Sequence, residues 1–370
     1  MQPTTYIFAT LAVFAFFWGA AWGSFLNVVI WRLPRQMSLV HPPSACPKCG
    51  SRIRWYDNVP VLGWLWLRGR CRDCGTRISA RYPFVEALVG VLSLAVFWHV
   101  AAGRIVVDDF GVIDTQLLAG VGVQFIAHFY LVAVLVAVAF IDLDLTIIPH
   151  RLTFPLIAWG LAMAALTHKD GAWIVYFPSV DLVDALIGAA VGGGSIAIVF
   201  KGYAMLRGFD GGGAGDIWLL AAIGANLGWA SIPIVLLLAS AQGILVAVAA
   251  LALERRSGKA VGEGGLLIEG AHTEAYWDRR DAEFAAEVAA LSGEEPPAPA
   301  PTDTADTQLG GSDDASEGTA ADAAPDGEPE PSGSLMQLAV PFGPFLAVAA
   351  VQYLFLGRTI LRWMTAGAYP

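Results

Sequence analysis

The chain has 370 residues, of which 56% are hydrophobic and only 15% are charged, and its formal net charge is −10. This composition excludes the class of ordinary water-soluble domains, which carry more charge and fewer long apolar stretches. It predicts an all-α polytopic membrane protein that has the lipid bilayer as its main surroundings. We expect no nucleic-acid partner.

A helix needs about 20 apolar residues to cross a bilayer. Six stretches are expected to form spans: Tyr6–Trp31, Phe84–Ala102, Leu117–Ile141, the shorter Leu152–His168, Leu182–Phe200 and Leu335–Gly357. Two more spans come from Ile217–Leu253, which is uncharged but too long for one crossing. Gly224, Asn226, Gly228 and Pro233 supply the break, so the first of the two, Asp216–Leu227, is short. We therefore expect about eight transmembrane helices.

The segment after the first span is strongly basic, with ten Lys or Arg residues from Arg32 to Arg81 against only Asp57 and Asp73. The positive-inside rule places this segment in the cytoplasm and the N-terminus outside. Arg32 and Arg35 follow the first apolar stretch and no basic residue precedes it, which indicates an uncleaved helix rather than a signal peptide.

The chain is expected to consist of five parts. They are a first transmembrane helix (1–31), a small cytoplasmic metal-binding insert (32–83), a transmembrane core (84–253), an acidic cytoplasmic insert (254–334), and a last transmembrane helix with the C-terminus (335–370). The acidic insert has few large apolar residues in its later part, so we expect it to be largely disordered. Residues 272–293 favour a short amphipathic helix. The insert is either a docking tail for a basic partner or a solvated linker, and its composition favours the linker.

All four cysteines lie in the basic segment, as two C-x-x-C pairs: Cys46 with Cys49, and Cys71 with Cys74. This spacing is typical of a tetrahedral Zn²⁺ site, and four thiolates leave no open coordination position, so the zinc would be structural. A glycine follows the second cysteine of each pair and permits the tight turn around the thiolates. A redox role is disfavoured because the segment is expected to be cytoplasmic.

Few acids lie in the apolar part of the chain, and each is a functional candidate because burying a carboxylate in a membrane is costly. Asp142 and Asp144 end the third span, before Pro149 breaks the chain, and Asp216 opens the sixth. Counting spans brings them to the same face of the membrane. Two facing carboxylates could share a proton and activate water against an amide. From the residues alone, a protease, an ion- or proton-coupled transporter and a structural role all remain open, and Asp216 could also be a helix N-cap.

Five motifs in the same order resemble those of the bacterial type IV prepilin peptidases, which are bifunctional leader peptidases and N-methyltransferases. They are GSFLNVVIWRLPR (23–35), the cysteine-bearing segment 41–86, AFIDLDLTIIP (139–149), GGGAGD (211–216) and PFGPFLA (341–347). The resemblance covers nearly the whole chain outside Gly258–Ser334.

The resemblance implies an intramembrane aspartic protease that cuts the basic leader from prepilins or type II secretion pseudopilins after a glycine, at the cytoplasmic side of the bacterial inner membrane. The family's first aspartyl motif has its acid seven residues before the proline, which assigns Asp142 rather than Asp144. Its Gly-x-Gly-Asp motif falls on Gly213, Gly215 and Asp216. Methylation of the new N-terminus would use S-adenosylmethionine.

Two positions depart from the family pattern. The family commonly has Asp after Ile-Pro, where this chain has His150, and Lys two residues after the second aspartate, where it has Trp218. Neither is an expected catalytic position, but both changes alter the local charge. The acidic insert is a third departure, and it interrupts no motif.

Overall fold

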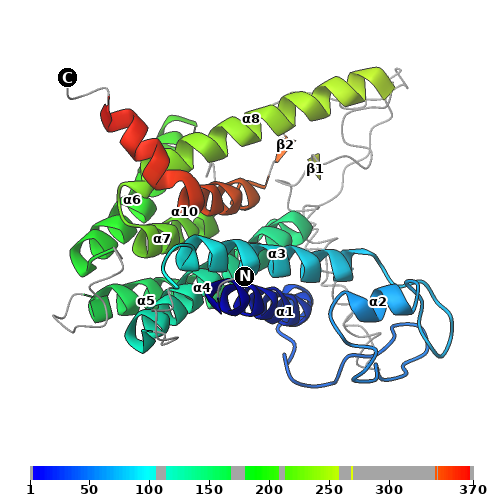
Figure 1. Cartoon of the computed structure of the whole chain (residues 1–370). Helices are drawn as coiled ribbons and strands as arrows, with labels where there is room; N and C mark the ends of the chain where they lie inside the picture. Colours follow the sequence, from blue (N-terminus) through cyan, green and yellow to red (C-terminus); the bar gives the residue numbers. More distant parts are fainter. Residues whose placement is uncertain are drawn as a thin grey trace, which may run out of the picture. The chain divides into compact units, whose positions relative to one another are not determined.

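The computed structural model describes residues 3–105, 114–167, 180–207, 213–257, 268–269, 338–339 and 341–366. Two compact units are found, one of Met1–Leu245 with Pro341–Pro370 and one of Val246–Val340. The helices of the first unit are α1 (Pro3–Arg32), α2 (Leu62–Trp66), α3 (Arg81–Ala101), α4 (Thr115–Leu145), α5 (His150–Thr167), α6 (Leu182–Arg207), α7 (Ala214–Leu227), the first part of α8 (Ser231–Ser257) and α10 (Gly343–Ala366), as Figure 1 shows.

The all-α polytopic architecture is confirmed. A helix lies at each of the eight places where a span is expected. Within the described residues, five helices (α1, α3, α4, α6 and α8) are long and apolar enough to cross a membrane, while α7 and the apolar part of α10 are shorter. The expected break between the sixth and seventh spans lies at Gly228, whose φ of +79° ends α7. The last helix begins at Gly343 and not at the expected Leu335.

The second unit departs slightly from an all-helical fold. Its described part holds the end of α8 and two strands of two residues each, β1 (Ile268–Glu269) and β2 (Leu338–Ala339), which pair antiparallel. The amphipathic helix expected at residues 272–293 and most of the acidic insert lie outside the described residues.

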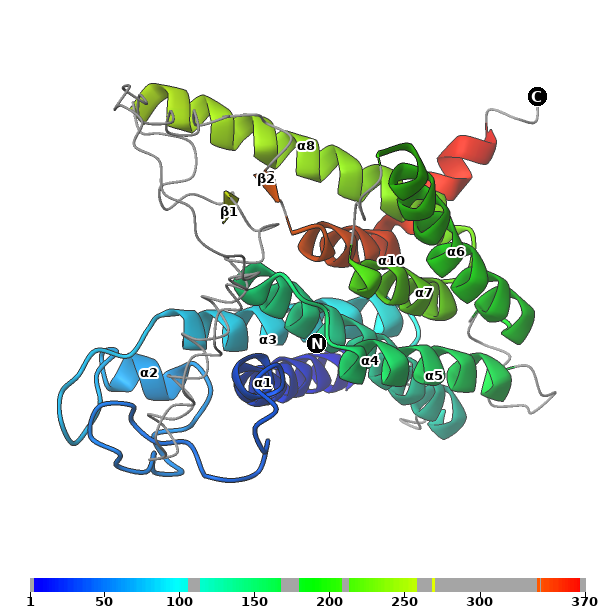
Figure 2. The same ribbon diagram turned by 180° about the vertical axis from the view of Figure 1, so that it is seen from behind.

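Helix α4 is the centre of the first unit, with other helices packed on both of its sides (Figure 2). Leu131, Leu135 and Val138 face a core shared with α5, α6, α7, α8 and α10. Ala133 and Ile141 face a second core shared with α1 and α3. A helix that is apolar all round can be buried on all sides, and this is the case for residues 131–138 of α4, all of which are buried.

Helices α6 and α7 pack backbone to backbone. A Cβ on Gly224 would lie 2.0 Å from the carbonyl oxygen of Gly188, and the reverse contact is equally tight. Small residues are the usual means of close helix contact in membranes, where apolar side chains gain little by leaving lipid. This contact holds α7, and therefore Asp216 at its start, firmly against the bundle.

Candidate active site and metal centre

Asp142 lies three residues before the end of α4 and is 5% exposed. The backbone N–H of Gly343, the first residue of α10, donates a hydrogen bond to its Oδ2 at 2.9 Å. Gly343 is itself buried, and 201 residues separate the two partners in the chain. A charge-assisted hydrogen bond from a helix N-terminus both orients a carboxylate and stabilises its charge. Asp142 is therefore a buried acid held by a distant helix.

Asp216 is the third residue of α7. The N-cap position belongs to Gly213, so the alternative that Asp216 is a helix cap is wrong. Its Oδ1 is buried and has no hydrogen-bond partner among the described residues. A buried polar atom without a partner is rare and costly, and in an enzyme it marks a place where a substrate or water can bind.

The two carboxyl groups come close enough for their charges to interact. Ile148 connects the segments that carry them. A Cβ on Gly215, beside Asp216, would lie 2.7 Å from the Cβ of Ile148, and a Cβ on Gly343, beside Asp142, would lie 3.1 Å from Ile148 Cδ1. The loop after α4 thus packs between the starts of α7 and α10, and this packing brings the two acids together.

Pro149 lies in that loop, as the sequence predicts. Helix α4 ends at Leu145, Thr146 takes a left-handed conformation with φ of +52°, and α5 begins at His150. The carbonyl oxygen of Pro149 accepts the N–H groups of Leu152 and Thr153 and so starts α5. The turn directs Ile148 toward the site.

The two motif glycines have different surroundings. A Cβ on Gly213 would meet only ordinary contacts, the nearest being 3.9 Å away, and the Oδ2 of Asp216 lies 4.0 Å away. The part of the chain that the structure describes therefore leaves space at Gly213 for the close approach of another backbone. At Gly215 the same space is already filled by Ile148, so packing within the protein explains this glycine.

Asp144, two residues after Asp142, points elsewhere. Arg81, the first residue of α3, donates from both terminal nitrogens to its two carboxylate oxygens, at 2.9 and 2.5 Å. The pair is partly exposed and ties the end of α4 to the start of α3. Of the two neighbouring acids, Asp142 is the one whose charge acts on Asp216.

The two departures from the family pattern contact each other. His150 stacks on Phe154 with ring centroids 5.2 Å apart, and Trp218 meets Phe154 edge-on at 4.9 Å. His150 and Trp218 are also edge-on to each other at 6.4 Å. Where an Asp and a Lys are common, this chain therefore has an aromatic cluster (His150, Phe154 and Trp218) that links α5 to α7 beside Asp216.

The four cysteines form a compact cluster in the segment between α1 and α3. Their sulfur atoms all lie within 4.8 Å of one another, with Cys46 to Cys74 at 3.8 Å and Cys49 to Cys71 at 3.9 Å. Four thiolates about 2.3 Å from a tetrahedral Zn²⁺ would be about 3.8 Å apart. The donor set and its spacing therefore fit a structural zinc ion.

Each C-x-x-C pair is built in the same way. The isolated bridges Ala45 to Arg52 and Arg70 to Arg77 close two short hairpins, each with a C-x-x-C-Gly turn at its tip. Gly50 and Gly75 have φ of +68° and +70°, as expected for the glycine after each pair. Nothing lies within 4 Å of a Cβ at either position, so conformation and not space requires the glycine.

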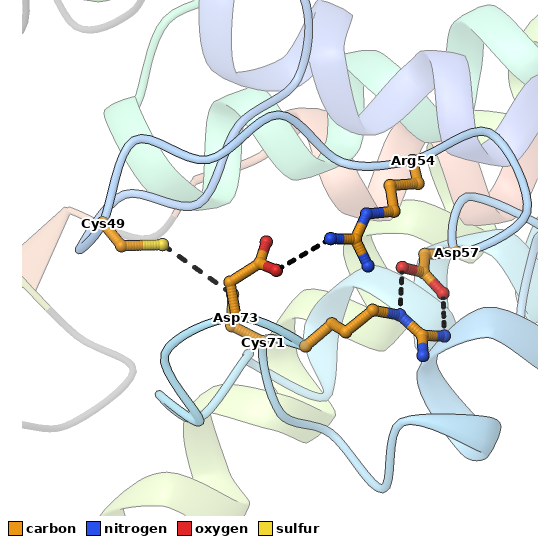
Figure 3. A network of polar contacts seen from close by, with 6 residues as sticks. Cys49, Arg54, Asp57, Cys71 and Asp73 are labelled. Carbon is orange, nitrogen blue, oxygen red and sulfur yellow. Dashed lines mark hydrogen bonds and ion pairs between the residues drawn. The ribbon is translucent and has the colours of Figure 1, made fainter.

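Both aspartates of the cysteine segment form ion pairs. Arg54 binds Asp73, and Arg72 binds both carboxylate oxygens of Asp57 (Figure 3). Hydrogen bonding to Arg72 holds the pKa of Asp57 below its usual value. The thiols influence one another: hydrogen bonds from Ser51 lower the pKa of Cys49 to about 6, whereas desolvation and hydrogen bonds with the other cysteines raise the pKa of Cys74 to about 11 despite the hydrogen bond from the Thr76 backbone.

Three residues that sequence reasoning did not assign belong to this arrangement: Gly343, Ile148 and Arg81. Gly343 lies in the PFGPFLA motif, and a glycine between two prolines was the sequence signal that could have marked it as a special backbone position. Ile148 and Arg81 gave no local signal, because their contacts join segments that are far apart in the sequence.

Comparison with known proteins agrees with this geometry. Residues 17–100 match the family described as the bacterial peptidase A24 N-terminal domain, and residues 129–248 match the type IV leader peptidase family. The second match contains both Asp142 and Asp216, and the first contains all four cysteines. No solved structure matches the chain.

Several curated relatives carry the name prepilin leader peptidase/N-methyltransferase. The protein from Myxococcus xanthus is 40% identical over 248 residues, which are 67% of this chain and 65% of the relative. That from Aeromonas hydrophila is 39% identical over 61% of this chain and 76% of its own length. That from Klebsiella pneumoniae is 38% identical over 61% of this chain and 90% of its own length.

Paired carboxylates in a membrane would also suit an ion- or proton-coupled transporter, but none of these matches supports that alternative. The shared sequence extends over the cysteine segment, the helices that carry both acids, and most of the length of two relatives. The chain belongs to the type IV leader peptidase family.

Proposed function

We propose that this protein is an aspartic endopeptidase that removes the basic leader of type IV prepilins or type II secretion pseudopilins after a glycine. Family membership supports the reaction class. The observation that carries the proposal is the meeting of two acids from distant helices, the buried Asp142 and the half-buried Asp216, beside Gly213, where the described residues leave open space. The expected surroundings are a bacterial inner membrane with the site facing the cytoplasm.

In the proposed reaction the two carboxyls work as a pair. One takes a proton from water while the water attacks the carbonyl carbon of the scissile glycine, and the other supplies a proton to the departing nitrogen. The pair shares its protons, so neither role is assigned to a single residue. The Gly343 N–H orients Asp142, and the unpartnered Oδ1 of Asp216 is free to bind the attacking water or the peptide.

Asp142 is proposed over Asp144 as the acid from α4. Asp144 is occupied by a two-point contact with Arg81 and is partly exposed, whereas Asp142 is buried and its charge acts on Asp216. Pro149, Gly213 and Gly215 are proposed as supporting residues that shape the loop and the start of α7.

Zinc is proposed as the ion held by Cys46, Cys49, Cys71 and Cys74. It would close a 48-residue connection between α1 and α3 that has no large apolar core of its own. The names of the relatives also support a second activity, methylation of the new N-terminal amine with S-adenosylmethionine.

The test is leader removal from a purified prepilin by the full-length protein in detergent or lipid. We expect Asp142→Asn and Asp216→Asn each to lose at least a thousandfold in rate, because each removes a proton-transferring group. Asp144→Asn is the matched control and should keep cleavage within severalfold of the original. Persistence of cleavage in either of the first two variants would contradict the assignment, and ion flux without any cleavage would contradict the proposed function.

A further inference from the structure

Thr153, on the first turn of α5, carries a buried hydroxyl that the reaction described so far does not use. The residue is 0% exposed, and its Oγ1 has no hydrogen-bond partner among the described residues. A buried hydroxyl without a partner is costly, because it has lost its hydrogen bonds to bulk water and gained none in exchange. Such a group in an enzyme is a candidate for binding something other than the protein itself.

The usual local partner of a helical threonine hydroxyl is the carbonyl oxygen four residues earlier. Here that oxygen belongs to Pro149, and it already accepts the N–H groups of Leu152 and Thr153 at 2.9 and 3.4 Å. The Thr153 hydroxyl makes no hydrogen bond to it. The hydroxyl therefore does not serve the helix that carries it, and its role must be sought toward a neighbouring element.

The side of α5 that carries Thr153 faces α7. Thr153, Leu156 and Gly160 are spaced three and four residues apart, so they share one face of the helix, and all three are buried. A Cβ on Gly160 would lie 2.8 Å from the backbone of Ala225, and the side-chain amide of Asn226 donates to the carbonyl oxygen of Leu156 at 3.0 Å. Thr153 thus lies on the face that α5 presents to α7.

Thr153 also lies at the level of the start of α7. Phe154, the next residue, meets Trp218 edge-on with ring centroids 4.9 Å apart. Because the Gly160 contact lies further along both helices, α5 and α7 run in the same direction. One residue before Phe154, Thr153 is therefore level with the first turn of α7, which carries Asp216. The Cα–Cβ bonds of a helix tilt toward its N-terminus, which directs the Thr153 side chain toward that turn.

The start of α5 adjoins α4 as well as α7. Leu152, next to Thr153, packs against both of the cores that share α4. The charge of Asp142, near the end of α4, acts on Asp216, so Asp216 lies at the same junction of helices. Its Oδ1 is also buried and without a partner among the described residues. Two unpaired buried polar atoms at one junction point to a group that binds both.

We propose that Thr153 is a further catalytic residue, whose hydroxyl and the Oδ1 of Asp216 together hold the water that attacks the scissile glycine. The inference rests on the proposed function, since it names a second partner for the attacking water of that reaction. The hydroxyl oxygen accepts one O–H of the water, and Oδ1 accepts the other. A lone pair of the water oxygen is then left to face the carbonyl carbon.

The threonine neither gains nor loses a proton in this step. The water oxygen forms a bond to the carbonyl carbon, and the π electrons of the carbonyl group move to its oxygen. The proton that points to Oδ1 passes to the carboxyl pair, which loses the negative charge that the carbonyl oxygen gains. The other proton stays on the former water oxygen and keeps its hydrogen bond to Thr153. The hydroxyl thus fixes the direction of attack.

The test is the kinetics of leader cleavage by the full-length variant Thr153→Val, in which a methyl group of similar size replaces the hydroxyl. We expect kcat to fall about tenfold or more, the effect of one hydrogen bond at the reacting atoms, while KM changes little because the peptide keeps its own contacts. The midpoint of thermal unfolding should stay the same or rise, since an unpaired buried polar group is removed. Thr153→Ser keeps the hydroxyl and should keep kcat within about threefold of the original.

Ser93→Ala is the matched control. Ser93, on α3, is also 0% exposed, but its hydroxyl donates to the carbonyl oxygen of Ala15 at 2.7 Å. Its removal should lower the midpoint of thermal unfolding and leave kcat unchanged, because this hydroxyl has a partner within the protein. The two variants are thus expected to show opposite patterns of stability and activity.

A kcat of Thr153→Val within about twofold of the original would overturn the inference, as would an equal loss in Thr153→Ser. A loss confined to KM would overturn it too, because the threonine would then bind the leader and not the water. The same holds for a loss of kcat accompanied by an unfolding midpoint as low as that of Ser93→Ala, which would indicate a role in the fold.

Asp216→Asn in the same assay separates this inference from the proposed function. If Asp216→Asn is inactive while Thr153→Val cleaves normally, only the role of Thr153 is wrong. If Asp216→Asn itself cleaves the leader, the proposed function fails.

Discussion

The contact between Gly343 and Asp142 makes a sharp prediction for the variant Gly343→Ala. The new Cβ would lie 2.6 Å from the Oδ2 of Asp142, whereas ordinary contact begins at about 3.4 Å. The carboxylate or the start of α10 must therefore move by about 0.8 Å. The 2.9 Å hydrogen bond would lengthen beyond normal geometry as a result.

The size of the effect follows from that bond. A hydrogen bond to a charged group contributes about 1.5–3 kcal/mol. Because about 1.4 kcal/mol corresponds to a tenfold change in rate, its loss predicts a kcat for leader cleavage roughly 10- to 100-fold lower. A misplacement of about 1 Å at a catalytic group has a similar cost. KM should change little, since Gly343 lies at the acid and not at the open space beside Gly213.

The control for this prediction is Gly243→Ala. It adds the same methyl group between α8 and α10, where the nearest atom of Phe345 is 3.7 Å away, an ordinary contact. This variant should keep normal kcat and thermal stability. If Gly343→Ala cleaves prepilin within twofold of the original, or if its loss of activity lies wholly in KM, the reasoning about Asp142 is wrong.

Three further predictions concern the metal, the aromatic cluster and the insert. Cys46→Ser and Cys71→Ser should each release one zinc ion per chain, as measured by atomic absorption. Full zinc occupancy in both variants would refute the site. Trp218→Lys should lower the midpoint of thermal unfolding, because it removes the ring contacts between α5 and α7. Adding His150→Asp to this variant should restore part of the lost stability by forming an ion pair with the new lysine. Additive effects of the two changes on the unfolding midpoint would contradict this coupling. Deletion of Gly264–Gly327 should leave leader cleavage unchanged if the insert is a linker, and a large loss in a gel-shift assay would indicate a role in binding the leader.

Much of the fold could be predicted from local signals. Uncharged stretches of sufficient length located the helices, and Pro149 and Gly228 marked breaks that the structure has. Such features act over a few residues, through backbone conformation and the cost of exposing charge to lipid. The last helix is the exception: apolar residues before Gly343 made the uncharged stretch longer than the helix, so the start of the helix was predicted too early.

The candidate site was only partly predictable. Its two acids could be named because an isolated carboxylate in an apolar stretch is conspicuous, but the preference for Asp142 over Asp144 came from the resemblance to a family. In the structure the same preference has a physical reason, since Arg81 occupies Asp144 while Gly343 binds Asp142.

The sequence by itself determined the helical membrane architecture, the two C-x-x-C pairs and the short list of candidate acids, because each depends on residue types and short spacings. Only the tertiary structure decided which groups meet. It placed Ile148 between Gly215 and Gly343 and joined His150 to Trp218 through Phe154. These contacts join segments separated by tens to hundreds of residues, and no local pattern encodes them because packing among whole helices brings them together.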